Sequence, residues 1–287
     1  MKNMLIRKAT PKDDERVKAL CLTDNPKDFV PGIWPVWMAG KNTTNLVAVA
    51  DGRIIGCIYG EIISGHDAWA QGLRVHPDFR KRGIGTKLMM ALESDLFQMG
   101  GKDIYANIGA FNEASLSTVL KLKWRIDTHF IRRRSKPTGR LQNQPVLFSR
   151  DRILKLIHGS PILASCKKVA YFQRAYFSMT NHYIDQAFRK NTIRVSPDGR
   201  AYAITDLETD PAKKIWVVAM AGEAPGIQWL LESFMGDAGR LGVELVIDST
   251  KNHLLQSLMD KLQFCPPEKN GHYVVVKKDL SEVNTNF

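Results

Sequence analysis

Apolar residues in the first half of the chain follow two periods, and each period predicts a different kind of element. The run 45–63, NLVAVADGRIIGCIYGEII, is β-prone on both sides of Asp51-Gly52. An Asp-Gly pair between two such runs favours a β-hairpin, because both positions tolerate a positive φ. The run 68–75, AWAQGLRV, predicts a further strand.

Helical spacing takes over after residue 83. A helix ended by Gly100-Gly101 is predicted there. The residues of its apolar face are Ile84, Leu88, Leu92, Leu96 and Met99. After the strand-like DIYANI, a shorter helix places Leu116, Val119 and Leu120 on its inner face.

A helix start is predicted near the beginning of the chain, where Thr10 is the N-cap, Pro11 the first helical residue and Asp13 the capping-box residue. The predicted order is therefore β-α-(α)-β-β-β-α-β-α. This order is typical of the α/β class, with a mixed sheet flanked by helices.

The second half repeats part of this pattern. Residues 112–124 read N-x-x-S-x-S-x-V-x-K-L-K-W, and residues 252–264 read N-x-x-L-x-S-x-M-x-K-L-Q-F. Trp69 in HDAWAQGLRV similarly matches Trp216 in KKIWVVAMAG. Between these landmarks the second copy is shorter by about seven residues, at the place where the first copy carries PDFRKRGIG. Such self-similarity predicts an internal duplication.

Composition narrows the possible classes of function only slightly. The 287 residues suffice for about two domains, and the net charge of +12 suits nucleic acid, an anionic membrane surface or a polyanionic small ligand. The four cysteines form no CxxC pair and the seven histidines are scattered, so we predict reduced thiols and no metal. Without a membrane-length apolar run or a signal peptide, the expected location is cytoplasmic.

The stretch 74–88, RVHPDFRKRGIGTKL, combines cations and glycines at the start of the predicted helix. A helix N-terminus presents unpaired N–H groups and the positive end of the helix dipole, so it attracts anions. Gly83 and Gly85 remove side chains that would keep a phosphate away from those groups. The spacing is not that of a P-loop. It is not a dinucleotide fingerprint either, because Leu88 stands where a small residue is needed.

This stretch resembles motif A of the GNAT-superfamily N-acetyltransferases, R/Q-x-x-G-x-G/A, in the form of residues 80–85, RKRGIG. The opening IRKATPKDDERVKAL, the Asp-Gly hairpin and the N-x-x-S…K-L-x-W segment also fall where that family places them. The resemblance covers residues 4 to about 130 and extends to the second half as a degenerate copy. It implies a GNAT acyl-CoA N-acyltransferase fold, duplicated in tandem. It further implies an enzyme that uses acetyl-CoA as a cosubstrate.

The resemblance also implies which residues bind acetyl-CoA, between the strands at 68–75 and 103–108. Backbone groups of Leu73, Arg74 and Val75 would pair with the pantetheine arm. The pyrophosphate would be held by the amides of Arg80, Lys81, Arg82, Gly83, Ile84, Gly85 and Thr86. Asn112 and Ser115 would reach the cofactor from the next helix, although Asn112 serves equally well as an ordinary N-cap.

The implied reaction is direct transfer of acetyl from the thioester to an amine, which must lose a proton. Glu61 is the candidate base, with a solvated strand end as its alternative interpretation, and the Val75 amide is the candidate oxyanion donor. The family often has an acid Tyr at a position that is Val119 here, and usually has Gly where Lys123 stands. Tyr105 or water is therefore the expected acid.

The resemblance and the lost loop together divide the chain into a catalytic GNAT domain, 1–145, and a degenerate GNAT-like domain, 146–287. The second copy has one Gly before its helix, in AGEAPGIQWLLESF, and Glu223 there would repel phosphate. We therefore expect residues 146–287 not to bind CoA. They would close over the cleft, supply specificity or stabilise the first domain.

Three functions remain open at this stage. The first is an N-acetyltransferase for a small molecule such as an amino acid, or for peptide N-termini or lysines. The second is a non-catalytic acyl-CoA sensor, suggested by Val119. The third is nucleic-acid binding. It ranks last because no helix-turn-helix, zinc finger or stacking-aromatic pattern supports it.

Overall fold

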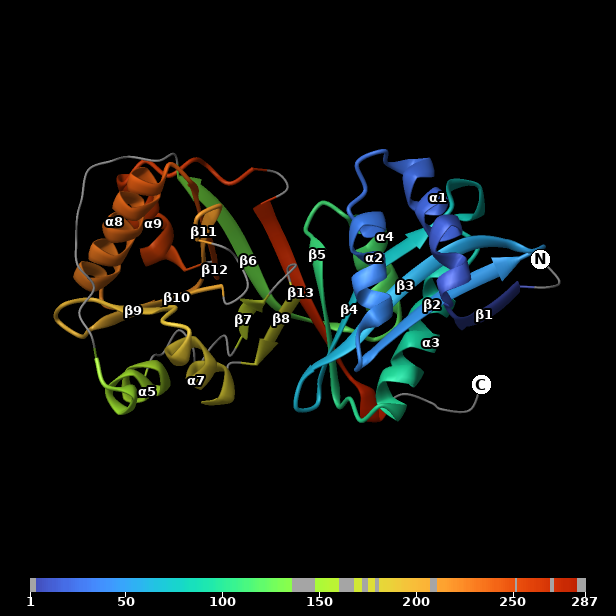
Figure 1. Ribbon diagram of the computed structural model, residues 1–287, viewed down its shortest axis with the longest axis horizontal. Coiled ribbons are helices and arrows are strands. Elements are labelled where there is room, and N and C mark those ends of the chain that lie inside the picture. Colours follow the sequence, from blue (N-terminus) through green and yellow to red (C-terminus); the bar gives the residue numbers. More distant parts are fainter. Residues whose placement is uncertain are drawn as a thin grey trace. The chain divides into compact units, whose positions relative to one another are not determined.

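The computed structural model describes residues 4–135, 148–159, 168–171, 175–178, 181–206, 211–250, 252–268 and 271–282. These residues form two compact units, which Figure 1 shows with their elements labelled. Within the described residues, unit 1 contains 4–106, 112–126 and 276–282, and unit 2 contains 107–111 and 127–275.

Unit 1 is a mixed sheet with helices on both faces, as the sequence predicts. Its elements are β1 (Met4–Lys8), η1 (Pro11–Asp13), α1 (Asp14–Asp24), α2 (Val30–Ala39), β2 (Thr43–Ala50), β3 (Arg53–Ser64), β4 (Asp67–Val75), η2 (Pro77–Phe79), α3 (Ile84–Gln98), the first part of β5 (Asp103–Gly109), α4 (Glu113–Lys121) and η5 (Leu280–Glu282). The strand order is β1-β2-β3-β4-β5. The first four strands pair antiparallel and β5 pairs parallel with β4.

Local signals in the sequence account for most elements of unit 1. The β2–β3 hairpin turns at Asp51 and Gly52, whose φ angles of 48° and 74° are those that an Asp-Gly turn requires. The predicted capping box of Thr10 and Asp13 is also present. Two predicted core residues are wrong. Met99 lies beyond the last turn of α3 and is 37% exposed, and Leu120 is 47% exposed on the outer face of α4.

The two faces of the sheet in unit 1 bury different helices. Gly56 and Gly60 of β3 face α3, whose Leu88 and Leu92 side chains lie where a Cβ would have to be. On the other face, Cys57 and Tyr59 join a buried cluster with residues of α1 and α2. Trp37 of α2 stacks on Tyr59 with ring centroids 4.3 Å apart. The glycines on one face of β3 and the large rings on the other therefore set how closely the helices on each face approach the sheet.

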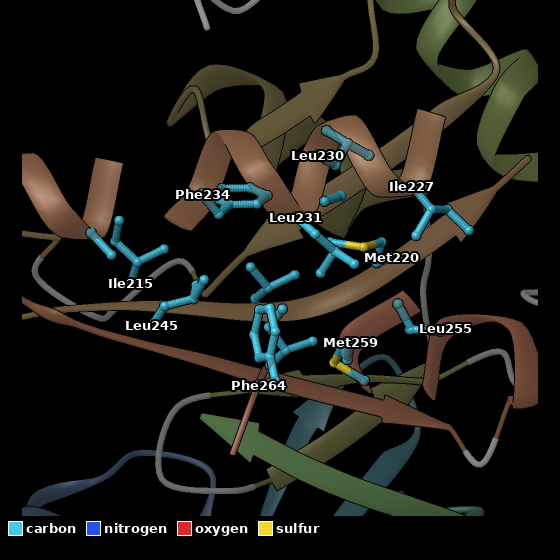
Figure 2. Packing of buried hydrophobic residues seen from close by; sticks show 14 of the residues in the cluster. Ile215, Met220, Ile227, Leu230, Leu231, Phe234, Leu245, Leu255, Met259 and Phe264 are labelled. Atoms are coloured by element: carbon cyan, nitrogen blue, oxygen red, sulfur yellow. The ribbon is translucent and has the colours of Figure 1, made fainter. Parts of the chain in front are cut away.

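Unit 2 repeats this layered arrangement. Its elements are β6 (Arg125–Ser135), which starts in unit 1, α5 (Arg150–His158), β7 (Lys168–Tyr171), β8 (Ala175–Ser178), α7 (Asn181–Arg189), β9 (Ile193–Val195), β10 (Ala201–Thr205), β11 (Lys214–Gly222), α8 (Ala224–Leu241), β12 (Glu244–Thr250), α9 (His253–Lys261) and the first half of β13 (His272–Asp279). The order in the sheet of unit 2 is β13-β6-β12-β11-β10-β9. Figure 2 shows α8 and α9 packing Leu231, Phe234 and Met259 against this sheet.

The duplication is visible in matching hydrogen bonds. Asn112 caps α4 by accepting from the Ser115 amide, and Asn252 caps α9 by accepting from the Leu255 amide, each at 3.1 Å. Each helix is followed, two residues later, by a residue with positive φ, Lys123 at 65° and Gln263 at 59°. The two segments predicted to repeat therefore share their helix, their N-cap and this turn.

The units are not continuous in sequence. Residues 127–135 of β6 belong to unit 2, whereas the end of β13 and η5 belong to unit 1. There Lys278 Nζ donates to the buried Glu93 carboxylate at 2.6 Å, and Trp124 Nε1 donates to the same carboxylate at 2.6 Å. The boundary predicted near residue 145 lies outside the described residues, so the roles assigned to 1–145 and 146–287 stay predictions.

Candidate functional site

Strands β4 and β5 separate after a short paired segment. Their pairing joins Asp67, Ala68 and Trp69 to Asp103, Ile104 and Tyr105 and ends there, although β4 runs on to Val75. Over its second half β4 stays paired with β3. One edge of β4, from residue 70 onward, is therefore not covered by β5.

A β-bulge at Gly72 accompanies this separation. Gln71 pairs with Tyr59 and Arg74 with Cys57, so β4 has one more residue than β3 between these pairs. Gly72 has φ 70°, and a Cβ there would lie 2.7 Å from the Trp37 ring. Only glycine fits, and the bulge bends β4. The sequence analysis missed this feature, although a lone Gly in a strand-like run is its usual signal.

At the end of β4, one backbone amide bonds to β3 and the peptide groups of the residue before it point away from β3. The His76 amide donates to the Ile55 carbonyl at 2.9 Å, so the preceding pair, Val75 with Gly56, is of the kind that does not exchange hydrogen bonds. The N–H and C=O of Val75 consequently point away from β3. The carbonyl accepts from Arg80 Nε at 3.2 Å. The Val75 N–H is thus directed to the edge that β5 leaves uncovered.

The loop after β4 turns into the first turn of α3. Lys81 and Gly83 adopt positive φ angles of 61° and 76°, and Gly83 is the N-cap, with no side chain bonded across the cap. The first helical hydrogen bond runs from the Lys87 amide to the Gly83 carbonyl at 3.0 Å. The N–H groups of residues 84–86 therefore lie before the helical ladder begins, at the positive end of a 15-residue helix.

The two glycines of this turn have different reasons to be glycine. Gly83 needs its positive φ, and a Cβ there would meet no atom of the described chain within 4 Å. Gly85 has an ordinary helical conformation. A Cβ on Gly85 would lie 3.7 Å from Leu73 Cδ2 and 3.8 Å from Val75 Cγ2, which are ordinary contacts. The fold itself thus does not require glycine at position 85.

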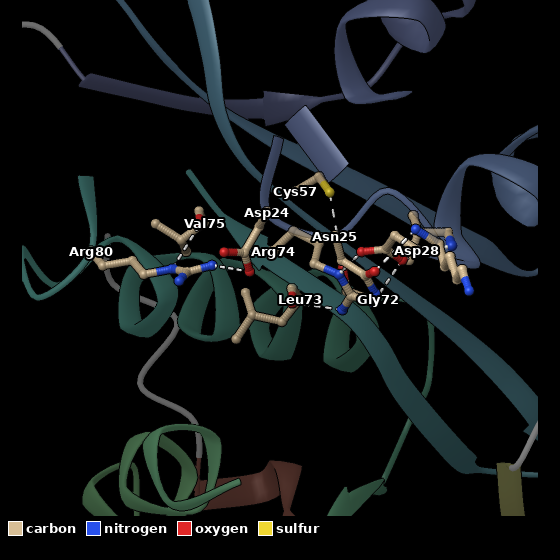
Figure 3. A network of polar contacts seen from close by, with 11 residues as sticks. Asp24, Asn25, Asp28, Cys57, Gly72, Leu73, Arg74, Val75 and Arg80 are labelled. Atoms are coloured by element: carbon tan, nitrogen blue, oxygen red, sulfur yellow. Dashed lines mark hydrogen bonds and ion pairs between the residues drawn. The ribbon is translucent and has the colours of Figure 1, made fainter. Parts of the chain in front are cut away.

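The arginines of the motif have carboxylate partners that the sequence analysis did not identify. Arg74 Nε and Nη2 donate to Asp28 at 2.6 and 2.9 Å, and Arg80 Nη2 donates to Asp24. Figure 3 shows both pairs, which tie the end of β4 to residues at and after the end of α1. Arg82 instead lies over the Phe79 ring, 5.4 Å from its centroid. These partners are 46 and 56 residues away in sequence, and no local signal marks them.

The two candidate catalytic side chains lie in one row across the sheet. Glu61 pairs with Trp69, and Trp69 pairs with Tyr105, which places all three on the same face. Burial raises the pKa of the half-buried Glu61 carboxyl above its ordinary value, against the opposing effect of a hydrogen bond with Tyr59. Tyr105 is 1% exposed, and Lys277 Nζ lies 5.3 Å from its ring centroid. Glu61 is therefore less solvated than an ordinary strand end.

The residues expected to reach the cofactor from α4 occupy its first turn. Asn112 is exposed and acts as the N-cap, and Ser115 is half-buried. Val119 is 3% exposed and belongs to the core. The N-cap interpretation of Asn112 is thus confirmed, and its contact with a cofactor stays a prediction.

The corresponding turn of unit 2 is closed. A Cβ on Gly226 of α8 would lie 2.7 Å from Ala201 Cβ and 2.8 Å from Ser196 Oγ, so β10 and the turn before it press against the helix start. Glu223 is the N-cap residue, and its carboxylate pairs with Arg200 at 3.1 Å. This helix start thus has an N-cap carboxylate, paired with Arg200, where α3 has Gly83.

Part of the chain resembles known acetyltransferases in sequence. Residues 15–122 match the model of the acetyltransferase (GNAT) family. An acetyltransferase of Pectobacterium atrosepticum is 38% identical over 79 residues, which are 28% of this chain and 55% of that protein. The chain thus spans about half the length of this curated relative.

Several solved structures resemble the whole chain. A Thermoplasma acidophilum protein described as a candidate acetyltransferase is 15% identical, with a TM-score of 0.61 over 96% of this chain and 99% of its own. A tandem GNAT protein from the clavulanic acid biosynthesis pathway is 12% identical, with a TM-score of 0.57 over 97% and 99%. Over residues 15–122 the chain therefore resembles the GNAT family, and the chain as a whole shares its fold with these two proteins.

Proposed function

We propose that the protein is an acetyl-CoA-dependent N-acetyltransferase whose donor site is the edge of β4 and the first turn of α3. The observation that carries this proposal is Gly85. The fold tolerates a side chain there, yet the sequence has none, beside N–H groups that precede the helical ladder. The space beside those groups is left open for a phosphate, and a side chain longer than a methyl group would fill it.

The donor residues follow from this placement. The amides of residues 80–86 would hold the pyrophosphate, and the second half of β4 would pair with the pantetheine arm as an added strand does. Asn112 and Ser115 are the proposed contacts from α4. Acetyl-CoA supplies an activated acetyl thioester. The protein has to position the thioester, to take a proton from the amine and to give one to the departing thiolate.

The catalytic roles are assigned by position and environment. Glu61 is the proposed base, because its raised pKa brings it closer to the pH at which it must take a proton from an ammonium. The Val75 N–H, directed away from β3, is the proposed oxyanion donor. Tyr105, at the last pair before β4 and β5 separate, is the proposed acid for the departing thiolate.

Thermal unfolding with and without acetyl-CoA tests the donor site. Acetyl-CoA at 100 times its Kd adds about 2.7 kcal/mol to the native state, and the Tm rises accordingly. In the variant Gly83→Glu/Gly85→Glu the two carboxylates would fill the phosphate site and repel the phosphates, so no rise in Tm with acetyl-CoA is expected. Pro225→Glu makes a comparable change at the start of α8 in unit 2 and keeps the full rise. If Gly83→Glu/Gly85→Glu retains the wild-type shift, the assignment is refuted.

The acceptor we propose is a primary amine on a small molecule, and peptide amines are the alternative. Thiol release from acetyl-CoA, measured with a panel of amino acids, polyamines and short peptides, separates the two. A non-catalytic acyl-CoA sensor is favoured by one observation, the buried Val119 at the position of the usual acid. A sensor binds acetyl-CoA but releases no thiol with any amine.

Unit 2 is proposed to stabilise unit 1 or to contribute acceptor specificity, and not to bind CoA, since its helix start is closed and acidic. Within the described residues no helix is long and apolar enough to cross a membrane. We propose a cytoplasmic location, where acetyl-CoA would be available.

A further inference from the structure

Arg80 is the first residue of the R-x-x-G-x-G motif, and its guanidinium forms an ion pair with the carboxylate of Asp24. Its Nε donates to the Val75 carbonyl at 3.2 Å, and its Nη2 donates to Asp24 Oδ2. The Nε contact keeps the guanidinium beside the end of β4, three residues before the N-cap Gly83. Figure 3 shows Arg80 extended between Val75 and Asp24.

Asp24 is suited to be a replaceable partner. It is the last residue of α1, and the Arg80 and Asp24 side chains are 47% and 48% exposed, so either can move into solvent. The neighbouring pair is different, because Asp28 is 4% exposed and accepts two hydrogen bonds from Arg74. The hydrogen bond from Arg80 holds the pKa of Asp24 below its ordinary value, so the carboxylate is charged at neutral pH.

We propose that Asp24 is an internal counter-ion of Arg80 which competes with the phosphates of the donor, so that Asp24 lowers the affinity specifically for phosphate-bearing acyl donors. The inference rests on the proposed donor site. An arginine can hold a carboxylate or a phosphate with the same N–H groups. When the phosphate arrives, Arg80 exchanges one anion for the other, and only the difference between the two pairs contributes to binding.

Replacing Asp24 with Asn removes the competing charge and preserves the shape. Exposed ion pairs are weak, so at low salt Asp24→Asn should bind acetyl-CoA more tightly by up to about fivefold. The gain should shrink in about 0.5 M salt, which screens exposed charges. S-acetylpantetheine lacks phosphates, and its affinity should not change.

The matched control is Glu15→Gln on the same helix. Glu15 is 85% exposed and lies near Lys18, so this variant makes the same change in net charge without touching Arg80. A second control is Arg80→Gln, in which Asp24→Asn should have no further effect on acetyl-CoA. Circular dichroism of each variant checks that it is folded.

Isothermal titration of the full chain with acetyl-CoA and with S-acetylpantetheine gives the answer. The inference holds if Asp24→Asn gains affinity for acetyl-CoA beyond Glu15→Gln and only when Arg80 is present. It is overturned if Asp24→Asn matches Glu15→Gln, binds more weakly, or gains equally for S-acetylpantetheine. If the wild type and all variants fail to bind acetyl-CoA, the donor site itself is refuted, and this inference fails with it.

Discussion

A Cβ atom on Gly85 would lie 3.7 Å from Leu73 Cδ2, a distance at which two carbon atoms make an ordinary contact. The first turn of α3 therefore has room for alanine and nevertheless carries glycine. A glycine that the fold does not need indicates a close approach by something else. Here it lies beside amides that an anion can use.

Gly85→Ala is accordingly predicted to change stability and binding in opposite directions. Alanine loses less backbone entropy on folding, so the free energy of unfolding should rise by about 0.5 kcal/mol. The affinity for acetyl-CoA should fall by less than tenfold, because the motif R/Q-x-x-G-x-G/A admits alanine at this position and one methyl group leaves most of the approach to the amides open. Urea unfolding and isothermal titration measure the two effects.

The matched control for this prediction is Gly32→Ala in α2. A Cβ at Gly32 would meet nothing within 4 Å in the described structure, and this glycine lies outside the loop. A similar gain in stability with unchanged affinity is expected. Equal affinity for Gly85→Ala and wild type would mean that the ligand leaves room for a methyl group at this turn.

In contrast to Gly85→Ala, Gly226→Ala in unit 2 should lower stability and leave the affinity for acetyl-CoA unchanged. Its Cβ would lie 2.7 Å from Ala201 Cβ and 2.8 Å from Ser196 Oγ, so the helix must shift. Overpacking of this kind costs about 1–3 kcal/mol of stability. Because unit 2 is not expected to bind CoA, the affinity of the folded variant for acetyl-CoA should stay unchanged. A large loss of affinity would place the second helix start in the donor site.

Glu61→Gln should slow catalysis strongly without loss of stability. General-base catalysis typically contributes 10²- to 10⁴-fold, so kcat should fall by that order while the Kd for acetyl-CoA stays the same. Burial opposes the charged form of Glu61, so the neutral amide should be tolerated at pH 7. A variant that keeps wild-type kcat would exclude Glu61 as the base.

The raised pKa of Glu61 also predicts a pH dependence. As a base it must be deprotonated, so kcat/KM should rise with pH through a value above that of an ordinary Glu. The contribution of Glu61 to the free energy of unfolding changes with pH in the opposite direction to kcat/KM. A pKa raised on folding favours the folded state at low pH, and this contribution is lost as the pH rises through the folded-state pKa. In Glu61→Gln the acidic limb of the rate profile should disappear.

Lys278→Ala should destabilise unit 1, although the residue lies near the end of the chain. It leaves the buried Glu93 carboxylate without its cation, and breaking such a pair costs about 3–5 kcal/mol. The double variant Glu93→Gln/Lys278→Met removes both charges and should recover much of the loss. Urea unfolding of both variants checks this. If Lys278→Ala unfolds like the wild type, β13 does not support unit 1.

The sequence predicted the elements with local signals and missed those set by distant partners. Asp51-Gly52 specifies its turn, and Asn112 and Asn252 specify their caps, within a few residues. Periodicity alone also placed Leu120 in the core, because a three-turn helix does not reveal how wide its buried face is. Helical spacing similarly continued through Met99, one residue beyond the helix.

The same limit applies to the candidate site. The glycine loop is a contiguous motif, so the sequence located it. Asp28, the partner of Arg74, and Asp24, the partner of Arg80, lie 46 and 56 residues away in sequence. Lys278, the cationic partner of Glu93, lies 185 residues away, and only the folded chain brings such pairs together. The bulge at Gly72 depends on Trp37, a ring from a different element.

Isothermal titration of the full chain with acetyl-CoA tests the central claim most directly, because it reports both affinity and stoichiometry. One site per chain is predicted, abolished in Gly83→Glu/Gly85→Glu and unchanged in Pro225→Glu. Two sites per chain, or one site that survives the double substitution, would contradict the assignment of the donor site to the first turn of α3.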